Sequence, residues 1–252
     1  MTWDWQVFLN DDGSGRTYLE WIIQAWGWTL SVAACAWVLS ISIGFVIGTL
    51  RTVNKYPWVV RLGNIWVEVF RNIPILVQVF LWYFVLPRIF ISMQHWSGFV
   101  LVVLALGFFT SSRIAEQVKA GINALPKGQG MASLALGLTP LQSYRYVILP
   151  MALRIILPPL TSESMNLLKN SSVAFAVSIP ELTMFAMQAQ EETSRGIEIY
   201  LAVTLLYAVS AFAVNRLMAA LERHLQIPGT SANEKTSSGP GKSELPSISG
   251  GH

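Results

Sequence analysis

Residues 21–50, WIIQAWGWTLSVAACAWVLSISIGFVIGTL, contain no Asp, Glu, Lys, Arg or His. An α-helix needs about 20 consecutive apolar residues to cross the hydrocarbon core of a bilayer, and this run is longer. The composition agrees, because 53% of all residues are hydrophobic and only 12% are charged, whereas about 25% are charged in ordinary soluble domains. The sequence therefore predicts an integral membrane protein.

Further apolar stretches follow this run. The weakest is interrupted by Arg154, Pro158, Pro159 and Glu163, so a hydropathy window alone scores it poorly. The residues before the first span are acidic rather than basic, which favours a retained helix over a cleaved signal peptide. We expect an all-α integral membrane protein with about five transmembrane helices. The predicted spans lie near residues 24–50, 62–86, 96–118, 146–169 and 197–218.

Lys and Arg are distributed unevenly among the predicted loops. They gather after the first, third and fifth spans, whereas the other loops and the N-terminus are mainly acidic. Cytoplasmic loops of membrane proteins carry an excess of Lys and Arg, so we expect a periplasmic N-terminus and a cytoplasmic C-terminus. The basic residues that carry this argument are Arg51, Lys55, Arg61, Lys119, Lys127, Arg145, Arg216, Arg223, Lys235 and Lys242.

The end of the chain differs from the rest. Residues 229–252 are rich in Ser, Gly and Pro and contain no aromatic residue, so they cannot bury enough apolar surface to order themselves. We expect one transmembrane domain, residues 1–228, followed by a disordered cytoplasmic tail, residues 229–252.

One predicted cytoplasmic segment, residues 126–145, is not a span. Met131 begins a short helix that Gly137 is expected to end, because glycine adopts the left-handed conformation without strain. Thr139, Pro140 and Gln142 then have the pattern of a helix start with a capping box. The sequence predicts two short helices that meet at a bend, with Ala132, Ser133 and Ala135 forming a small-residue docking face, and a sharp stop at Pro150.

The spacing in this segment resembles a family signature. GQGMASLALG at residues 128–137 and VILP at residues 147–150 resemble the cytoplasmic loop of ABC importer permeases, whose pattern is E-A-A, three residues, G, nine residues and I-x-L-P. EVFRNIP at residues 68–74 and NLLKNSS at residues 166–172 resemble the polar amino acid branch. Within that branch the chain is most similar to glutamate/aspartate import permeases.

This resemblance implies partners and a role for the segment. It implies two ATPase subunits, a second, homologous permease chain, a periplasmic substrate-binding protein and a place in the bacterial inner membrane, with no nucleic acid partner. The family's acidic residue is replaced by Met131, and its second Ala by Ser133, which suggests an asymmetric pair of permeases. The implied ATPase-coupling residues are Gly128, Gln129, Met131, Ala132, Ser133, Ala135, Gly137 and Pro150.

The chain has no phosphate-binding loop of the form G-x-x-x-x-G-K-S/T, the pattern that cradles nucleotide phosphates. We therefore expect a translocation subunit, not an enzyme, with no catalytic or metal-binding residue. No cofactor is expected on this chain, because ATP and Mg would be used by the partner ATPase subunits.

Ionisable and polar residues inside membrane spans are costly and are therefore functional candidates. The predicted substrate path consists of Arg71, Gln78, Glu163, Asn166 and Lys169. Arg and Lys suit carboxylates, and Glu suits an ammonium group. The alternative is structural: Arg71 pairs with Glu68 on one helix face, and Lys169 extends to the membrane interface.

Three other functions stay open at this level. A permease for another polar amino acid such as glutamine fits the same motifs. A stand-alone channel or secondary carrier would need no ATPase, and the spaced loop motif argues against it. An integral membrane enzyme would need a metal cluster or an activated nucleophile, and the three histidines, His95, His224 and His252, lie in no ligand pattern.

Overall fold

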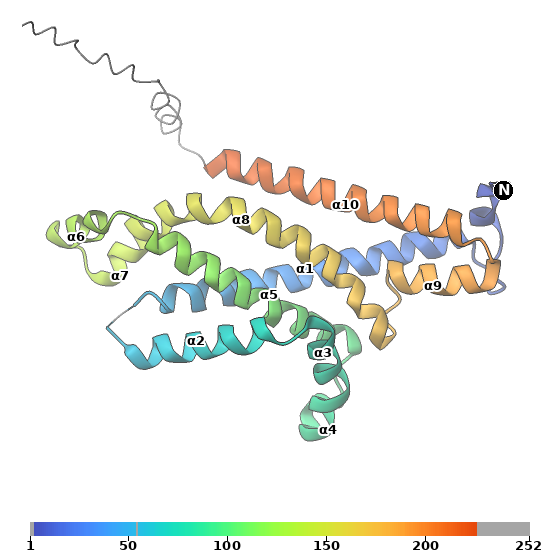
Figure 1. Cartoon of the computed structure of the whole chain (residues 1–252), viewed down its shortest axis with the longest axis horizontal. Helices are drawn as coiled ribbons and strands as arrows, with labels where there is room; N and C mark the ends of the chain where they lie inside the picture. The colour runs from blue at the N-terminus through green and yellow to red at the C-terminus, as the bar shows by residue number, and fades with distance from the viewer. Residues whose placement is uncertain (1–2, 54, 226–252) are drawn as a thin grey trace, which may run out of the picture.

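The computed structural model describes residues 3–53 and 55–225, so the predicted tail at 229–252 lies outside the described residues. Within the described part, long helices run side by side along one axis (Figure 1). Three helices are long and apolar enough to cross a membrane, or up to five if each of two bent helix pairs counts as one span. The prediction of an all-α membrane protein with about five spans is confirmed.

The first long helix, α1 (Tyr18–Leu50), begins at a capping box. The Thr17 hydroxyl accepts a hydrogen bond from the Glu20 amide, and the Glu20 carboxylate accepts one from the Thr17 amide. At 33 residues and 1.5 Å per residue, α1 is about 50 Å long, well beyond the roughly 30 Å hydrocarbon core. The helix therefore crosses the bilayer and continues past it.

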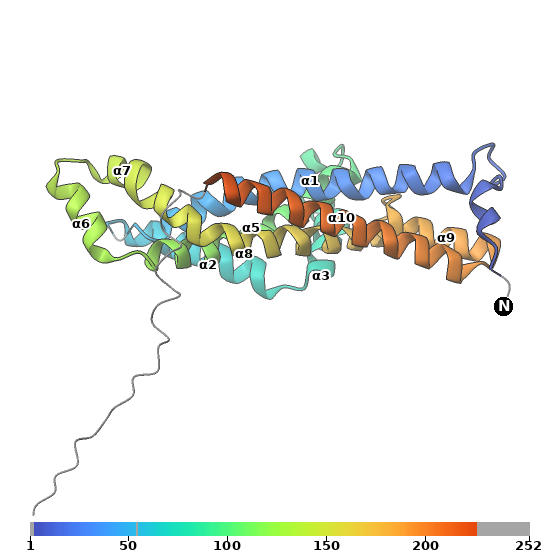
Figure 2. The ribbon, with the colours of Figure 1, turned by 90° about the horizontal axis from the view of Figure 1, so that it is seen from above.

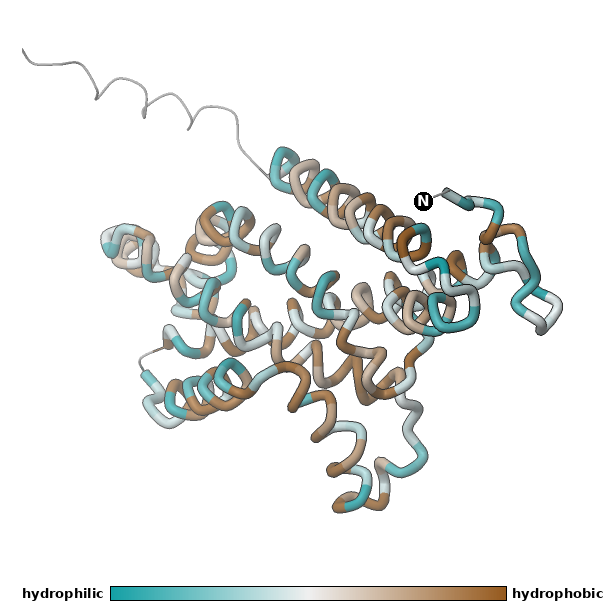
Figure 3. Tube along the Cα trace, turned by 45° about the vertical axis from the view of Figure 1, so that its right-hand side comes forward, coloured by the Kyte–Doolittle hydropathy of each residue, from teal (hydrophilic) through white to brown (hydrophobic). Residues whose placement is uncertain are grey.

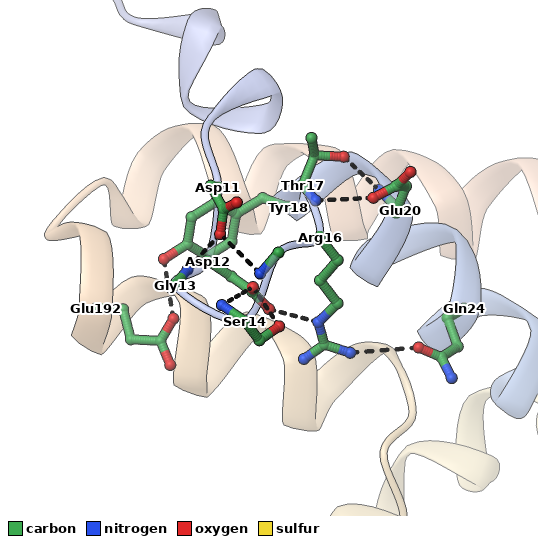
Figure 4. Close-up of polar contacts among 11 residues, drawn as sticks. Asp11, Asp12, Gly13, Ser14, Arg16, Thr17, Tyr18, Glu20, Gln24 and Glu192 are labelled. Carbon is green, nitrogen blue, oxygen red and sulfur yellow. Dashed lines mark hydrogen bonds and ion pairs between the residues drawn. The ribbon is translucent and has the colours of Figure 1, made fainter.

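A tight turn precedes α1 (Figure 4). The Asp12 carboxylate accepts hydrogen bonds from the Ser14 amide and hydroxyl and forms an ion pair with Arg16. These contacts, the Ser14 hydroxyl first, lower the pKa of Asp12 from 3.8 to about 2. The Arg16 guanidinium also lies 4.5 Å from the ring centre of Trp21, so the turn is fixed to the first turns of α1.

The buried face of α1 has a regular spacing of four residues. Val32, Ala36, Ser40, Gly44 and Gly48 are all buried, which is the ridge that packs into the groove of a neighbouring helix. That neighbour is α5 (Gly98–Asn123). A Cβ atom at Gly44 would lie 2.6 Å from a methyl group of Ile114, so the two backbones approach too closely for any side chain there.

The expected single span at 62–86 is broken. The structure has α2 (Pro57–Asn72), then Pro74, then α3 (Ile75–Phe80), a π-helical turn (Leu81–Val85) and α4 (Leu86–Ile89), and the two halves are bent by 103°. Pro74 ends the helix because proline restricts the residue before it to extended conformations. The α3–α4 arm consequently leaves the bundle sideways (Figure 1), and Figure 3 shows it largely apolar.

Gln78 stabilises this break. Its side-chain amide donates hydrogen bonds to the carbonyl oxygens of Phe70 at 2.7 Å and Ile73 at 2.9 Å. These carbonyls belong to the last turn of α2, where no intrahelical donor remains. The buried amide therefore replaces the missing backbone donors.

The two short helices predicted before α8 are present. They are α6 (Lys127–Ala135) and α7 (Pro140–Ser143). Gly137 has a positive φ of 84°, the Leu138 amide donates to Ser133 and the Gly137 amide donates to Leu134, which is a Schellman motif. The Thr139–Gln142 capping box is also present. Both local predictions are confirmed, although α6 starts four residues earlier than expected.

Pro150 is not a stop. A π-helical turn (Tyr144–Ile148) leads into α8 (Leu149–Asn170), and Pro150 is the second residue of that helix. Proline lacks the amide hydrogen and its ring crowds the preceding turn, and a π-helical turn relieves both problems. The α3–α4 arm repeats this arrangement, since its π-helical turn ends two residues before Pro87.

The last part of the bundle contains the second bend. After α8 a 3-10 segment (Ser171–Val177) ends at Ser178, whose φ is 60°. Next come α9 (Leu182–Thr193), bent by 53° from the preceding helix, and α10 (Gly196–Leu225). The buried Glu181 carboxylate caps α9 by accepting from the Thr183 and Met184 amides, and it also accepts from the Tyr207 hydroxyl of α10.

Two groups of segments lie at opposite ends of the bundle. The N-terminal segment, α9 and the start of α10 lie at one end, and α6, α7 and the α1–α2 turn lie at the other (Figures 1 and 2). The described end of α10 points toward the α6–α7 end. Within the described residues, the basic loops that the sequence assigned to one side of the membrane therefore lie at one end of the molecule; Lys235 and Lys242 lie outside the described residues.

Candidate functional site

A polar cavity of about 440 Å³ lies beside the α2–α3 break. Ile75 contributes from the start of α3, Phe109 and Arg113 from α5, and Asn166, Lys169 and Asn170 from the last turns of α8. Two of the five residues predicted for the substrate path, Asn166 and Lys169, therefore line one cavity. Its volume falls in the range of small-ligand sites.

An ion pair joins α5 and α8 at this cavity. The Arg113 guanidinium donates to the two carboxylate oxygens of Glu163, with Nε–Oε2 2.7 Å and Nη2–Oε1 2.9 Å. Gln117 donates a third hydrogen bond to Glu163 at 3.1 Å. The Glu163 carboxylate is thus engaged by protein donors, which leaves little capacity for the ligand ammonium group expected from the sequence.

Lys169 carries the second positive charge of the cavity. Its side chain is exposed, and among the described residues no ion pair joins it to a carboxylate. With Arg113 and Glu163 balancing each other, the cavity has a net charge of about +1. The arrangement can bind a small anion beside Lys169. Other polar groups of that anion can form hydrogen bonds with the Asn166 and Asn170 side chains.

Arg71 and Gln78 do not line this cavity. Gln78 is buried and used to bridge the α2–α3 break. Arg71 forms its ion pair with Glu116 of α5, at 4.0 Å, and not with Glu68 as the structural alternative expected. Glu116 in turn accepts a 2.6 Å hydrogen bond from Arg51, so Arg71 belongs to a separate charged cluster nearer the α6–α7 end.

Arg113 is the cavity residue that sequence reasoning missed. It lies inside the predicted span 96–118, as does Glu116, but neither is among the residues predicted for the substrate path. The signal was present, because an ionisable residue within a span is a functional candidate by position alone. Its pairing with Glu163, fifty positions later, was not visible from the sequence.

The α6–α7 loop projects from the end of the bundle (Figures 1 and 2). Its exposed apolar side chains are Met131, Leu134, Leu136 and Leu141, with exposed fractions from 50% to 84%. Ala132 and Ala135 are also exposed, as the predicted docking face requires. The loop therefore presents an apolar surface that the rest of the described chain does not cover.

Ser133 is a correction to the predicted docking face. It is buried and its hydroxyl lies 2.5 Å from the Ser143 hydroxyl and donates to the Gly130 carbonyl oxygen. Ser133 therefore ties α6 to α7 rather than facing a partner. Gly128 is exposed, Gln129 is partly buried, and Pro150 is exposed at the start of α8.

The comparisons with known proteins agree with this architecture. A family model described as "Binding-protein-dependent transport system inner membrane component" matches residues 40–227. The chain is 39% identical over 239 residues to the glutamate/aspartate import permease protein GltJ of Escherichia coli (strain K12), with 90% of this chain and 96% of that protein covered. It is 33% identical to the probable glutamine ABC transporter permease protein GlnP of Bacillus subtilis (strain 168), with 80% and 90% covered.

Solved structures show the same fold. A chain of an amino acid ABC transporter crystallised with histidines is 30% identical, with a TM-score of 0.73 and coverage of 89% of this chain and 100% of that chain. A chain of the inward-facing MetNI methionine ABC transporter is 20% identical with a TM-score of 0.70, covering 83% of this chain and 98% of that chain. The chain therefore belongs to the family of inner membrane components of binding-protein-dependent transport systems, as a multi-pass translocation subunit of the bacterial inner membrane.

Proposed function

We propose that this chain is the permease subunit of an ATP-driven importer for an acidic amino acid, glutamate or aspartate. The observation that carries the proposal is the cavity lined by Arg113 and Lys169. Glu163 does not line it but pairs with Arg113, so the charge of Lys169 is left uncompensated there. The proposal's support from sequence is the 39% identity to a glutamate/aspartate import permease.

The cavity matches the charge of such a substrate. At neutral pH an acidic amino acid carries two carboxylates and one ammonium group, a net charge of −1, against about +1 in the cavity. Lys169 offers a point charge, and the exposed edge of Arg113 offers further N–H donors. We assign Asn166 to the substrate's hydrogen-bonding groups, and we keep Arg71 as a path residue outside the cavity.

The α6–α7 loop is proposed as the surface that receives the ATPase subunits. Its apolar side chains, Met131 and Leu134 among them, are exposed at the end of the bundle, and its shape is fixed by the Gly137 turn and the Ser133–Ser143 contact. A rigid projection can transmit a movement of its partner to α8, which is continuous with α7 through the π-helical turn.

The proposed assembly has two ATPase subunits, a homologous second permease and a periplasmic binding protein that delivers the amino acid. The partner ATPases would use ATP and Mg. The N-terminal end of the bundle would face the periplasm and the α6–α7 end the cytoplasm, because the basic loops gather at the α6–α7 end. Met131 stands where the family has an acidic residue, and this difference favours a pair of two different permease chains.

The test is uptake of labelled amino acids by proteoliposomes that contain the full assembly, with and without this chain. Glutamate, aspartate, glutamine and histidine are compared at equal concentration, each with its binding protein present. We expect uptake of glutamate and aspartate that requires this chain and ATP. Uptake of another amino acid alone would reject the acidic substrate, and uptake without ATP would reject the importer.

Glutamine is the second candidate substrate. Asn166 and Asn170 line the cavity and suit an amide side chain, and two relatives at 33% and 34% identity are probable glutamine permeases. The uncompensated charge of Lys169 favours the acidic substrates, since a neutral amide gains less from it.

A further inference from the structure

A second cavity, of about 640 Å³, lies at the α6–α7 end of the bundle. One wall is formed by the last residues of α1 and the turn that follows, from Thr49 to Tyr56. The other wall is formed by Thr139 to Leu149, the segment that joins the projecting loop to α8. The cavity thus lies between a membrane-spanning helix and the loop assigned to the ATPase subunits.

The lining combines apolar side chains with two cations. Leu50, Val53, Leu141 and Leu149 supply apolar surface, and Lys55 and Arg145 supply positive charge. Among the described residues no carboxylate pairs with either cation. Each lies instead near the aromatic ring of the next residue, Lys55 at 5.5 Å from the ring centre of Tyr56 and Arg145 at 5.6 Å from that of Tyr146.

Hydroxyl groups complete the lining. The Tyr144 hydroxyl lies 3.1 Å from the Thr52 hydroxyl and donates to the Thr52 carbonyl oxygen at 3.2 Å. This contact joins the two walls directly. Thr49 and Thr139 also line the cavity. The Thr52 and Thr139 hydroxyls donate within the chain, to the Thr49 carbonyl oxygen and the Gln142 side chain, so the two cations are the groups left to bind an anion in this mainly apolar space.

The position of the cavity matches the boundary of a bilayer. The cavity begins at the end of α1, where the uncharged run ends at Leu50, a residue that is 42% exposed. The first basic residues after that run follow directly. At that depth an acyl chain has apolar partners such as Leu50, and a headgroup has Lys55 and Arg145. Basic pockets between helices on the cytoplasmic side are suited to anionic headgroups.

We propose that this cavity binds the headgroup of an anionic phospholipid. The phosphate is held by Lys55 and Arg145, and the acyl chains lie along the exposed apolar residues at the end of α1. Bound there, the lipid connects the α1–α2 turn to the segment that carries the projecting loop, and it stabilises one position of that loop. The site thereby makes the loop sensitive to the anionic lipid content of the membrane.

The first experiment measures lipid retention. The full chain is extracted with its partner subunits, mixed with equal amounts of phosphatidylglycerol and phosphatidylethanolamine, and examined by native mass spectrometry. We expect preferential retention of phosphatidylglycerol. The Lys55→Gln, Arg145→Gln double variant should lose about 30-fold in affinity for it, the loss expected for two basic residues near an anionic surface.

A charge-matched control isolates the cavity. The Arg61→Gln, Arg154→Gln double variant also removes two positive charges, but from exposed positions that do not line the cavity. It should keep the preference for phosphatidylglycerol. Melting temperatures of the two double variants, compared with wild type, show that both are folded. Equal loss of the preference in the control variant would overturn the proposal.

A second experiment distinguishes the occupants. A photo-crosslinking amino acid at Leu50 should give an adduct with the mass of one phospholipid. An adduct with the mass of an ATPase subunit would overturn the proposal and place a protein in the cavity. Millimolar inorganic phosphate should not displace phosphatidylglycerol, and displacement would show a site for free phosphate instead of a lipid.

Discussion

Arg113 of α5 and Glu163 of α8 form a two-point ion pair, with Nε–Oε2 2.7 Å and Nη2–Oε1 2.9 Å. The two side chains differ in environment, since Glu163 is 6% exposed and Arg113 is 41% exposed. The buried Glu163 carboxylate therefore depends on Arg113 to compensate its charge, whereas the Arg113 guanidinium keeps access to the polar cavity. In the proposed site, one residue thereby serves both the packing of two spans and the binding of a ligand.

The ion pair predicts a strong dependence of stability on Arg113. Arg113→Met should destabilise the chain by about 3 kcal/mol, because it leaves a buried carboxylate without its partner. Glu163→Gln should cost less, since the amide oxygen still accepts a hydrogen bond from the partly exposed guanidinium. The melting temperature of the purified assembly checks both. A double change to Met at both positions that is no more stable than Arg113→Met would contradict the pairing argument.

Lys169 is predicted to act on the substrate rather than on the fold. Lys169→Met should lower glutamate uptake by about two orders of magnitude, because it removes the uncompensated charge of the cavity, while the melting temperature stays near that of wild type. Arg154→Met is the control, an exposed cation on the same helix that does not line the cavity. Similar uptake by both variants would remove Lys169 from the proposed substrate path.

Gln78 is predicted to maintain the α2–α3 break. Gln78→Leu should destabilise the assembly by about 1–3 kcal/mol, because two carbonyl oxygens lose their donor in a buried place. Hydrogen exchange should show the change in residues 70–80 first. Gln94→Leu, at an exposed position, should have no effect. If Gln78→Leu instead reduced uptake with unchanged stability and exchange, Gln78 would be a substrate-path residue, as the sequence alone suggested.

The projecting loop is predicted to need a small side chain at Ala135. Ala135→Trp should abolish uptake and stimulation of ATP hydrolysis while the chain stays in the membrane, because a bulky ring holds two packed surfaces apart. Ala124→Trp, exposed at the same end but outside α6, serves as the control and should retain activity. Normal uptake by Ala135→Trp would rule out α6 as the docking surface.

The N-terminal turn is predicted to resist acid. The pKa of Asp12 is lowered to about 2, so its contribution to stability is present above the ordinary value of 3.8 and is lost as the pH falls toward 2. The Ser14 amide, which donates to Asp12, should keep its NMR chemical shift from pH 7 to about pH 3.5. In Asp12→Asn this shift should not titrate at all. A midpoint near 3.8 in wild type would show that the contacts do not favour the ionised carboxylate.

The local features of this chain follow from the sequence because each depends on neighbouring residues. The uncharged run at 21–50 is long enough to require a span, and Gly137 and the Thr139–Gln142 pair define the bend of the projecting loop through backbone conformation and hydrogen bonds within five positions. The family spacing in that loop is likewise local. Charge distribution among the loops indicated which segments share one end of the bundle.

Only the tertiary structure decided which polar residues act together. Arg71 and Glu163 looked alike in the sequence, as charged residues in predicted spans, yet the first pairs with Glu116 and the second with Arg113 across fifty positions. Gln78 looked like a path residue, yet its side chain donates to backbone carbonyl oxygens at the α2–α3 break. No hydropathy pattern shows the 103° bend at that break. The reason is physical: apolar content determines that a helix enters the membrane, whereas the partner of each buried charge depends on how the helices rotate and cross.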